Sequence, residues 1–238
     1  MSDHRKHCAG LISLAVHELR TPTAVVSGYL RMVLRHFGEN LSDQQRKLLE
    51  ESEKSCGALA RLLSDFADLS QLEEGAVPFK RQPVALWPML NQVASAVQEG
   101  RDRGLALEVE APKEDVVIEG DPNRLSDAVG SLATAVLRER QGGARVVAAG
   151  RVSVLGGSRS AVIAFGDYET ASGLAGTFDT LQTNSFDEYR GGLGFRLPAA
   201  ARIVEAHGGR LASPVSERGR LVIVMALPLT IARAETIA

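Results

Sequence analysis

Residues 17–22 have the sequence His-Glu-Leu-Arg-Thr-Pro and place a nucleophile beside groups that can assist it. An imidazole exposed on a helix can accept a phosphoryl group from a donor that approaches in line. Glu18 can accept the second ring proton of His17, which fixes the tautomer and leaves the other nitrogen free to attack. Thr21 projects near His17 one helical turn later, and Pro22 removes an amide and bends the helix. These residue types favour phosphoryl transfer, although a lone exposed histidine is usually only a solvated side chain.

A long amphipathic helix is expected to hold this segment. Apolar residues recur at spacings of three, four and seven before the breaker at residues 38–40, which is typical of one stripe on a helix. The residues of this stripe are Ile12, Val16, Leu19, Val26, Leu30, Val33 and Phe37, among which Ile12, Leu19, Val26 and Val33 hold the heptad positions. On that count His17 lies on the opposite side of the helix, where we expect solvent.

A second helix is expected after the breaker, and Ser42 can cap its first turn. Its seam advances in alternating steps of three and four residues: Leu48, Ser52, Ser55, Leu59, Leu62, Phe66 and Leu69. Residues 1–76 are therefore predicted to form an all-α antiparallel helical hairpin. Because one hairpin cannot bury this seam alone, we expect a homodimer through the hairpin, with four helices in a bundle. A hairpin without chemistry would explain this pattern, but not the residues at 17–22.

Helices and strands alternate in the rest of the chain, residues 77–238. Asp121-Pro122 opens one of the helices, with proline in the first turn, where its missing amide is harmless. Helices are predicted at 86–98, 121–139 and 198–206, and strands at 105–109, 116–119, 145–154, 160–165 and 221–227. This order predicts an α+β sandwich after the hairpin.

Composition and charge exclude several classes of function. The formal net charge is −2, so the chain lacks the concentrated basic face that a nucleic-acid partner requires. No apolar run approaches the roughly 20 residues of a bilayer-spanning helix, and no signal-peptide segment follows the start. We therefore expect a cytoplasmic protein with no membrane segment in this chain.

The string at 17–22 resembles the phospho-acceptor box of the largest family of sensor histidine kinases. The resemblance extends over nearly the whole chain, because residues 191–197 resemble the second glycine box of the ATP-binding domain in these kinases, and residues 203–209 follow at the family's spacing. It implies a dimerisation and histidine-phosphotransfer hairpin over 1–76 and an ATP-binding domain of the histidine-kinase type over 77–238. His17 is then the phospho-acceptor, Glu18 assists the transfer, and Thr21 supports dephosphorylation of a partner response regulator.

The resemblance also implies ATP with Mg²⁺ as cofactor. Glycines such as Gly192 and Gly194 let backbone amides approach phosphates closely. Arg138 stands where the family has a phosphate-facing basic residue, and Asp167 stands where a carboxylate reads the adenine amino group. His207 is interpreted as a structural residue at a helix end rather than as a second acceptor.

Other positions depart from the family's pattern. Its two asparagines on the helix after Asp121 are replaced by Ser131 and Ala135, and alanine offers no oxygen to a magnesium ion, so no metal ligand is assigned. The two glycines expected in the first glycine box are Glu169 and Ala171, and Phe178 is interpreted as a remnant of the phenylalanine box.

Three hypotheses for the function follow. The first is a two-component histidine kinase that phosphorylates His17 from ATP and passes the group to an aspartate in the receiver domain of a response regulator. The second is a histidine phosphotransferase with the same two domains that binds no ATP and serves a phosphorelay. The third is a pseudokinase that acts only as an interaction module.

Overall fold

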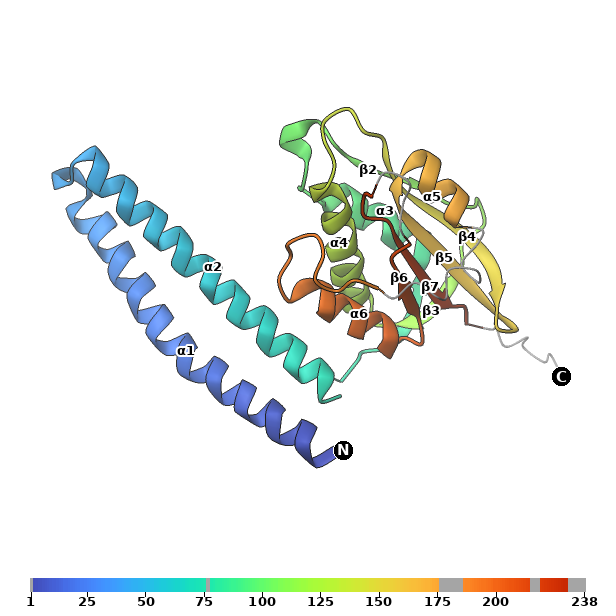
Figure 1. Ribbon diagram of the computed structural model, residues 1–238, viewed down its shortest axis with the longest axis horizontal. Coiled ribbons are helices and arrows are strands. Elements are labelled where there is room, and N and C mark those ends of the chain that lie inside the picture. Colours follow the sequence, from blue (N-terminus) through green and yellow to red (C-terminus); the bar gives the residue numbers. More distant parts are fainter. Residues whose placement is uncertain (1, 76–77, 176–185, 215–218, 231–238) are drawn as a thin grey trace. The chain divides into compact units, whose positions relative to one another are not determined.

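The computed structural model describes residues 2–75, 78–175, 186–214 and 219–230, with the backbone alone for residues 2–9. The chain divides into two compact units, Met1–Val77 and Pro78–Ala238. Figure 1 shows two long helices in the first unit and a mixture of helices and strands in the second. No described helix is long and apolar enough to span a membrane.

The first unit is a helical hairpin, as the sequence predicted. α1 spans Ser2–Phe37, a short 3-10 turn spans Gly38–Asn40, and α2 spans Asp43–Glu73. Ser42 begins α2 with a capping box: its hydroxyl accepts from the amide of Gln45, and the Gln45 side chain accepts from the amide of Ser42. These two bonds satisfy backbone amides that the first turn of a helix otherwise leaves unpaired.

Apart from Val16, which belongs to the predicted stripe of the first helix, the residues buried between α1 and α2 differ from the predicted seam. They are Val16, Thr23 and Ser27 of α1 and Leu63 and Ser70 of α2. Leu48, Leu59 and Leu62 of the predicted seam keep 57%, 47% and 43% of their surface exposed. Large apolar side chains of both helices are therefore left exposed within one hairpin. The seam is left uncovered within one chain, as expected for a hairpin that completes its core with a second copy.

The second unit contains two sheets. β1 (Gln82–Ala85) pairs antiparallel with β3 (Val117–Gly120). The larger sheet has the strand order β2-β4-β5-β7-β6. Its strands are β2 (Leu107–Glu110), β4 (Val146–Leu155), β5 (Ser158–Asp167), β7 (Ile223–Pro228) and β6 (Arg210–Ala212). The pair β2–β4 is parallel and the other pairs are antiparallel.

Helices lie on both faces of the larger sheet (Figure 1). They are α3 (Leu86–Ala96), α4 (Pro122–Arg138), α5 (Tyr168–Leu174) and α6 (Arg196–Ala206), with a 3-10 turn at Arg101–Arg103. Successive residues of a strand face opposite sides, so the bulky Ile163 and Phe165 of β5 face one layer while Val162 and Ala164 face the other. The predicted α+β sandwich is confirmed.

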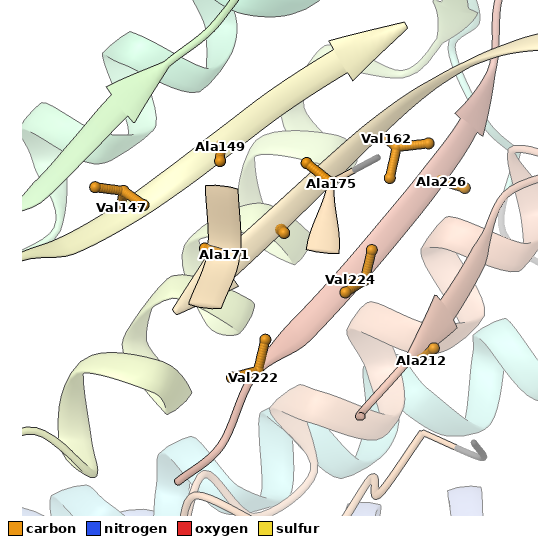
Figure 2. Close-up of a cluster of buried hydrophobic side chains, with 10 residues drawn as sticks. Val147, Ala149, Val162, Ala171, Ala175, Ala212, Val222, Val224 and Ala226 are labelled. Carbon is orange, nitrogen blue, oxygen red and sulfur yellow. The ribbon is translucent and has the colours of Figure 1, made fainter. Parts of the chain in front are cut away.

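A helix that the sequence did not predict, α5, begins directly after Asp167. Its buried residues Ala171 and Ala175 pack on a cluster of small side chains from the sheet, which Figure 2 shows. The other cluster members are Val222, which directly precedes β7, and the sheet residues Val147, Ala149, Val162, Ala164, Ala212, Val224 and Ala226. Because Glu169 and Ala171 stand where glycines would favour a loop, the segment can continue as a helix.

Candidate functional site

The phospho-acceptor segment lies in the middle of α1. Val16 is 3% exposed because it points into the hairpin, and the next residue on the helix projects away from that interface. The side chain of His17 is accordingly 77% exposed. Its Nδ1 lies 3.4 Å from Oε1 of Glu18, at the outer limit of a hydrogen bond. The imidazole is thus open to an incoming donor and has a carboxylate beside one ring nitrogen.

Thr21 and Pro22 follow on the same stretch of α1. Thr21 is exposed and lies four residues beyond His17, so the two residues share a face of the helix. Pro22 has no amide to donate to the carbonyl four residues earlier, yet α1 continues through it. The hydroxyl of Thr23 donates to the carbonyl oxygen of Leu19 over 2.7 Å, which adds a bond to this weakened turn. The structure therefore places His17 and Thr21 on one exposed face of a continuous helix, with Glu18 exposed beside His17.

Asp167, the expected adenine-reading carboxylate, lies at the end of β5 and is already paired. Its Oδ1 is 3.0 Å from Nε of Arg140 and 3.6 Å from Nη1 of Arg220. The Arg140 side chain is completely buried and also donates through Nη2 to the carbonyl oxygen of Leu221 over 2.7 Å. Burial lowers the pKa of the Arg140 guanidinium, and the charge of Asp167 opposes this shift. The two groups therefore form an ion pair in which the guanidinium is buried and the carboxylate is 23% exposed.

Ala135, at the expected magnesium-ligand position, is completely buried under the glycine-rich loop. Gly191 has φ +85°, and a Cβ added to it would lie 2.9 Å from Cβ of Ala135. The backbone of Gly191 therefore packs directly on the methyl group of Ala135. This position offers neither an oxygen ligand nor room for a hydrated cation. The residues present do not fit a magnesium ion held as in the family.

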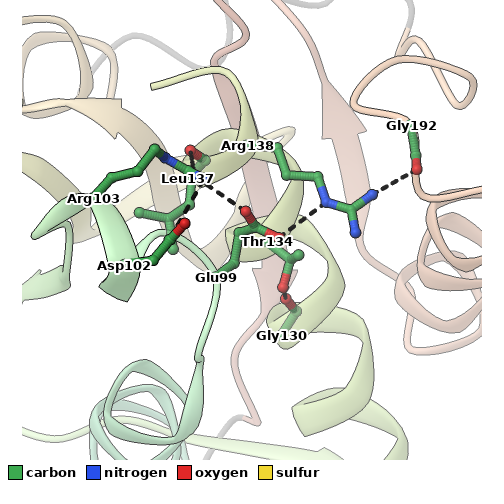
Figure 3. A network of polar contacts seen from close by, with 8 residues as sticks. All are labelled: Glu99, Asp102, Arg103, Gly130, Thr134, Leu137, Arg138 and Gly192. Atoms are coloured by element: carbon green, nitrogen blue, oxygen red, sulfur yellow. Dashed lines mark hydrogen bonds and ion pairs between the residues drawn. The ribbon is translucent and has the colours of Figure 1, made fainter. Parts of the chain in front are cut away.

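Arg138, the expected phosphate-facing residue, bonds to protein groups on both of its sides. Its Nη1 donates to the carbonyl oxygen of Gly192 over 2.6 Å, and its Nε donates to Oε2 of Glu99 over 3.0 Å (Figure 3). Arg103 donates to the other carboxylate oxygen of Glu99 over 3.1 Å. Burial raises the pKa of Glu99, but the hydrogen bonds from Arg138 and Arg103 outweigh it, so the pKa lies below its ordinary value. Glu99 is therefore a charged partner that Arg138 has without any ligand.

Glu139 completes a run of three ionic residues at the end of α4. Arg190 donates to both of its carboxylate oxygens, over 2.7 and 2.8 Å, and the amide of Leu221 donates to it over 2.7 Å. Burial raises the pKa of Glu139, but the bonds from Arg190 and Leu221 bring it below its ordinary value. We call Arg138, Glu139 and Arg140 the α4 clasp, because together they bond to four segments: the chain after α3, the end of β5, the glycine-rich loop and the chain before β7.

The other predicted residues of the second unit fall at loops and helix ends. Gly192 and Gly194 have φ of +63° and +59° and lie between Gly191 and the start of α6. Phe178 lies outside the described residues. The sequence reasoning missed Glu99, Glu139, Arg140 and Arg190, whose roles come from partners 27 to 82 residues away in the chain.

His207 has a structural role, as the sequence predicted. It is buried at the end of α6, where Nδ1 lies 2.7 Å from the carbonyl oxygen of Ile203 and Nε2 accepts from the amide of Asp121 over 3.0 Å. These two bonds assign the proton to Nδ1 and use both ring nitrogens. Burial lowers the pKa of His207, and the bond to Ile203 opposes this. The side chain joins the end of α6 to the start of α4.

Comparisons with known proteins bear on both units. Residues 10–75 match the His Kinase A (phospho-acceptor) domain. The signal transduction histidine-protein kinase BaeS of Escherichia coli is 32% identical over 227 residues, 90% of this chain and 45% of the relative. The chain has the transmitter region of the sensor histidine kinases.

A second relative and a solved structure are also similar to this chain, and the structure bears on the fold alone. The sensor protein DivL of Caulobacter vibrioides is 28% identical over 201 residues, 82% of this chain and 25% of the relative. The crystal structure of full-length ShkA in complex with AMPPNP shares the fold with a TM-score of 0.71 and 20% identity, over 94% of this chain and 46% of that chain. The transmitter thus spans less than half of the length of the two curated relatives named here.

Proposed function

We propose that this transmitter acts in two-component signal transduction by carrying a phosphoryl group on His17 and transferring it to an aspartate of a response-regulator receiver domain. The observation that supports this most is the exposed imidazole of His17 inside a matched phospho-acceptor domain. A cytoplasmic site of action, where receiver domains are available, is part of the proposal.

The residues around His17 suit both steps of such a transfer. With the proton on Nδ1 held towards Glu18, the lone pair of Nε2 points outward and attacks the phosphorus. The imidazolium that forms then gives up its Nδ1 proton to the Glu18 carboxylate. Thr21 lies on the face of α1 that an approaching receiver would cover, where its hydroxyl can orient a water for dephosphorylation of that receiver.

The outer apolar face of the hairpin supports a homodimer. Leu48, Leu59 and Leu62 expose about half of their surfaces on α2, and Val25, Tyr29 and Met32 do so on α1. A face of this length is costly to leave in water and is covered when two hairpins form a four-helix bundle.

ATP is the phosphoryl donor that the similar proteins suggest, because BaeS is named a histidine-protein kinase and the ShkA structure contains AMPPNP. In this chain, the site residues described above do not fit magnesium–ATP in the family's arrangement. The proposed role of His17 does not depend on which donor supplies the group.

Replacing His17 tests the proposal, and His36 offers a matched control because it is an exposed histidine on the same helix. The wild-type chain, His17→Gln and His36→Gln are incubated with radiolabelled ATP and, separately, with receiver domains labelled from acetyl phosphate. We expect label on the wild type and on His36→Gln from at least one donor, and none on His17→Gln. Label on His17→Gln at the wild-type level, or no label on any protein from either donor, would refute the proposed function.

A further inference from the structure

The residues at the expected nucleotide-binding positions, Asp167, Ala135 and Arg138, are engaged here by other groups of the protein. We propose that the second unit binds no adenine nucleotide, and that His17 receives its phosphoryl group from an aspartyl phosphate on a receiver domain. This proposal rests on the proposed function of His17 and names the donor.

Arg140 is the residue that decides the adenine end of the site. A carboxylate can accept from an adenine amino group only if its oxygen is free and correctly directed. Oδ1 of Asp167 instead accepts from a completely buried guanidinium at 3.0 Å, with Arg220 at 3.6 Å from the same oxygen. An adenine amino group that took this oxygen would displace Nε of Arg140, and the buried guanidinium would then keep only the carbonyl oxygen of Leu221, which costs more than one neutral hydrogen bond returns.

The phosphate end is closed by packing and by a second ion pair. Gly191 lies on the methyl group of Ala135, so a magnesium ion finds no oxygen there and no space. Without the metal, the charge of a triphosphate must be met by arginines, but Arg138 is engaged by Glu99 and by the Gly192 carbonyl. The glycine-rich loop thus bonds to Arg138 through a carbonyl oxygen, which repels a phosphate rather than binding it.

Glu139, the remaining residue of the α4 clasp, is also bonded within the protein. Glu139 and Arg190 form a two-point ion pair, and Glu139 also accepts from the amide of Leu221. All three residues of the α4 clasp therefore bond to surrounding loops without a ligand. A domain that closes in this way keeps its fold in the absence of nucleotide, while the acceptor on α1 remains exposed.

The donor in this proposal is a phosphorylated group of another protein, and the receiver aspartate is chemically suited. In the transfer, the P–O bond to the aspartyl carboxylate breaks and a P–N bond to Nε2 of His17 forms. The aspartate leaves as a carboxylate, and the Nδ1 proton of the imidazolium passes to Glu18. The transfer therefore balances without ATP or a metal ion bound to this chain, because the phosphoryl group comes from the aspartyl phosphate of the receiver.

Nucleotide binding is measured first, by the melting temperature and by titration calorimetry of the full wild-type chain with ATP and with ADP, each with Mg²⁺ at millimolar concentration. We expect no change in melting temperature and no saturable heat, because a ligand that binds only the folded state raises its stability. The double variant Ala135→Asn, Arg140→Thr introduces an amide oxygen and removes the buried guanidinium, and should show saturable ATP binding where the wild type shows none. Arg202→Gln is the control, because it removes an arginine that pairs with Glu188 and Glu205 instead of the clasp.

The donors are then compared directly. His17 should be labelled by receiver domains phosphorylated with acetyl phosphate and not by radiolabelled ATP. Saturable ATP binding by the wild type, or labelling of His17 from ATP, overturns the inference while leaving His17 as the acceptor. Equal failure of the wild type and of a correctly folded double variant to bind ATP overturns the role given to Arg140. Failure of both donors to label His17 instead overturns the proposed function.

Discussion

The ion pair between Arg140 and Asp167 predicts an unequal response to removal of its two members. Asp167→Ala leaves the Arg140 guanidinium completely buried, with the Leu221 carbonyl as its remaining partner. Loss of one member of a buried pair costs about 3–5 kcal/mol of the free energy of unfolding. We expect a loss of about 3 kcal/mol here, because the bond to the Leu221 carbonyl survives. Arg140→Met leaves a carboxylate that is 23% exposed and still has Arg220 at 3.6 Å. Because water and Arg220 compensate that carboxylate and methionine fills most of the volume, this variant should lose only about 1–2 kcal/mol.

The assay is urea unfolding followed by fluorescence of Trp87, the single tryptophan, which is buried on α3 and so reports the second unit. Asp167→Asn serves as control, because it keeps the Oδ1 acceptor and removes only the charge, and it should fall between the wild type and Asp167→Ala. If Asp167→Ala unfolds within about 0.5 kcal/mol of the wild type, Asp167 is not a structural partner of Arg140 but a carboxylate that awaits a ligand. That result would refute the reasoning about the α4 clasp.

Three further predictions concern other parts of the chain. The pKa of His207 in the folded state is below the unfolded value of about 6.5, so the unfolded state binds more protons as the pH falls through this range. The contribution of His207 to the stability of the second unit should therefore be fully present above about pH 6.5 and be lost as the pH decreases, and urea unfolding of His207→Gln should show a smaller loss than the wild type. An equal loss in both proteins would contradict this prediction. Gly191→Ala should cost about 2–3 kcal/mol in urea unfolding, because its φ is +85° and the new methyl group meets Ala135 at 2.9 Å; an unchanged midpoint would show that the loop does not rest on α4. Leu59→Glu should shift the chain from dimer to monomer in light scattering after gel filtration, since it places a charge on the outer face of the hairpin, and a dimer of unchanged stability would exclude that face as the interface.

The hairpin was predictable because its signals are local. A capping serine, a glycine-containing break and regular apolar spacing each act within a few residues. The choice of inner face was not predictable from hydrophobicity, because Thr23, Ser27 and Ser70 are buried between the helices while Leu59 and Leu62 are not. Periodicity shows that a helix has an apolar face, but a second face of small residues is decided by the packing of both helices and of a partner.

The second unit shows the same limit at its site. The α+β order and the glycine-rich loop followed from local patterns. The pairing of Arg140 with Asp167 did not, because the two residues are 27 positions apart and neither has a local signal for the other. The substitution of Ala135 indicated a lost metal ligand, but only the structure shows that Gly191 takes up the space. Sequence reasoning identified which ligand groups were missing and could not identify what replaced them.

The location of the phosphate tests the central claim most directly. The wild-type chain, loaded from a phosphorylated receiver, is digested at alkaline pH, where phosphohistidine persists, and the modified residue is identified by tandem mass spectrometry. We predict phosphate on His17 alone among the histidines, and its loss when unphosphorylated receiver is added back. Phosphate on another residue, or phosphate on His17 that no receiver removes, would contradict the account.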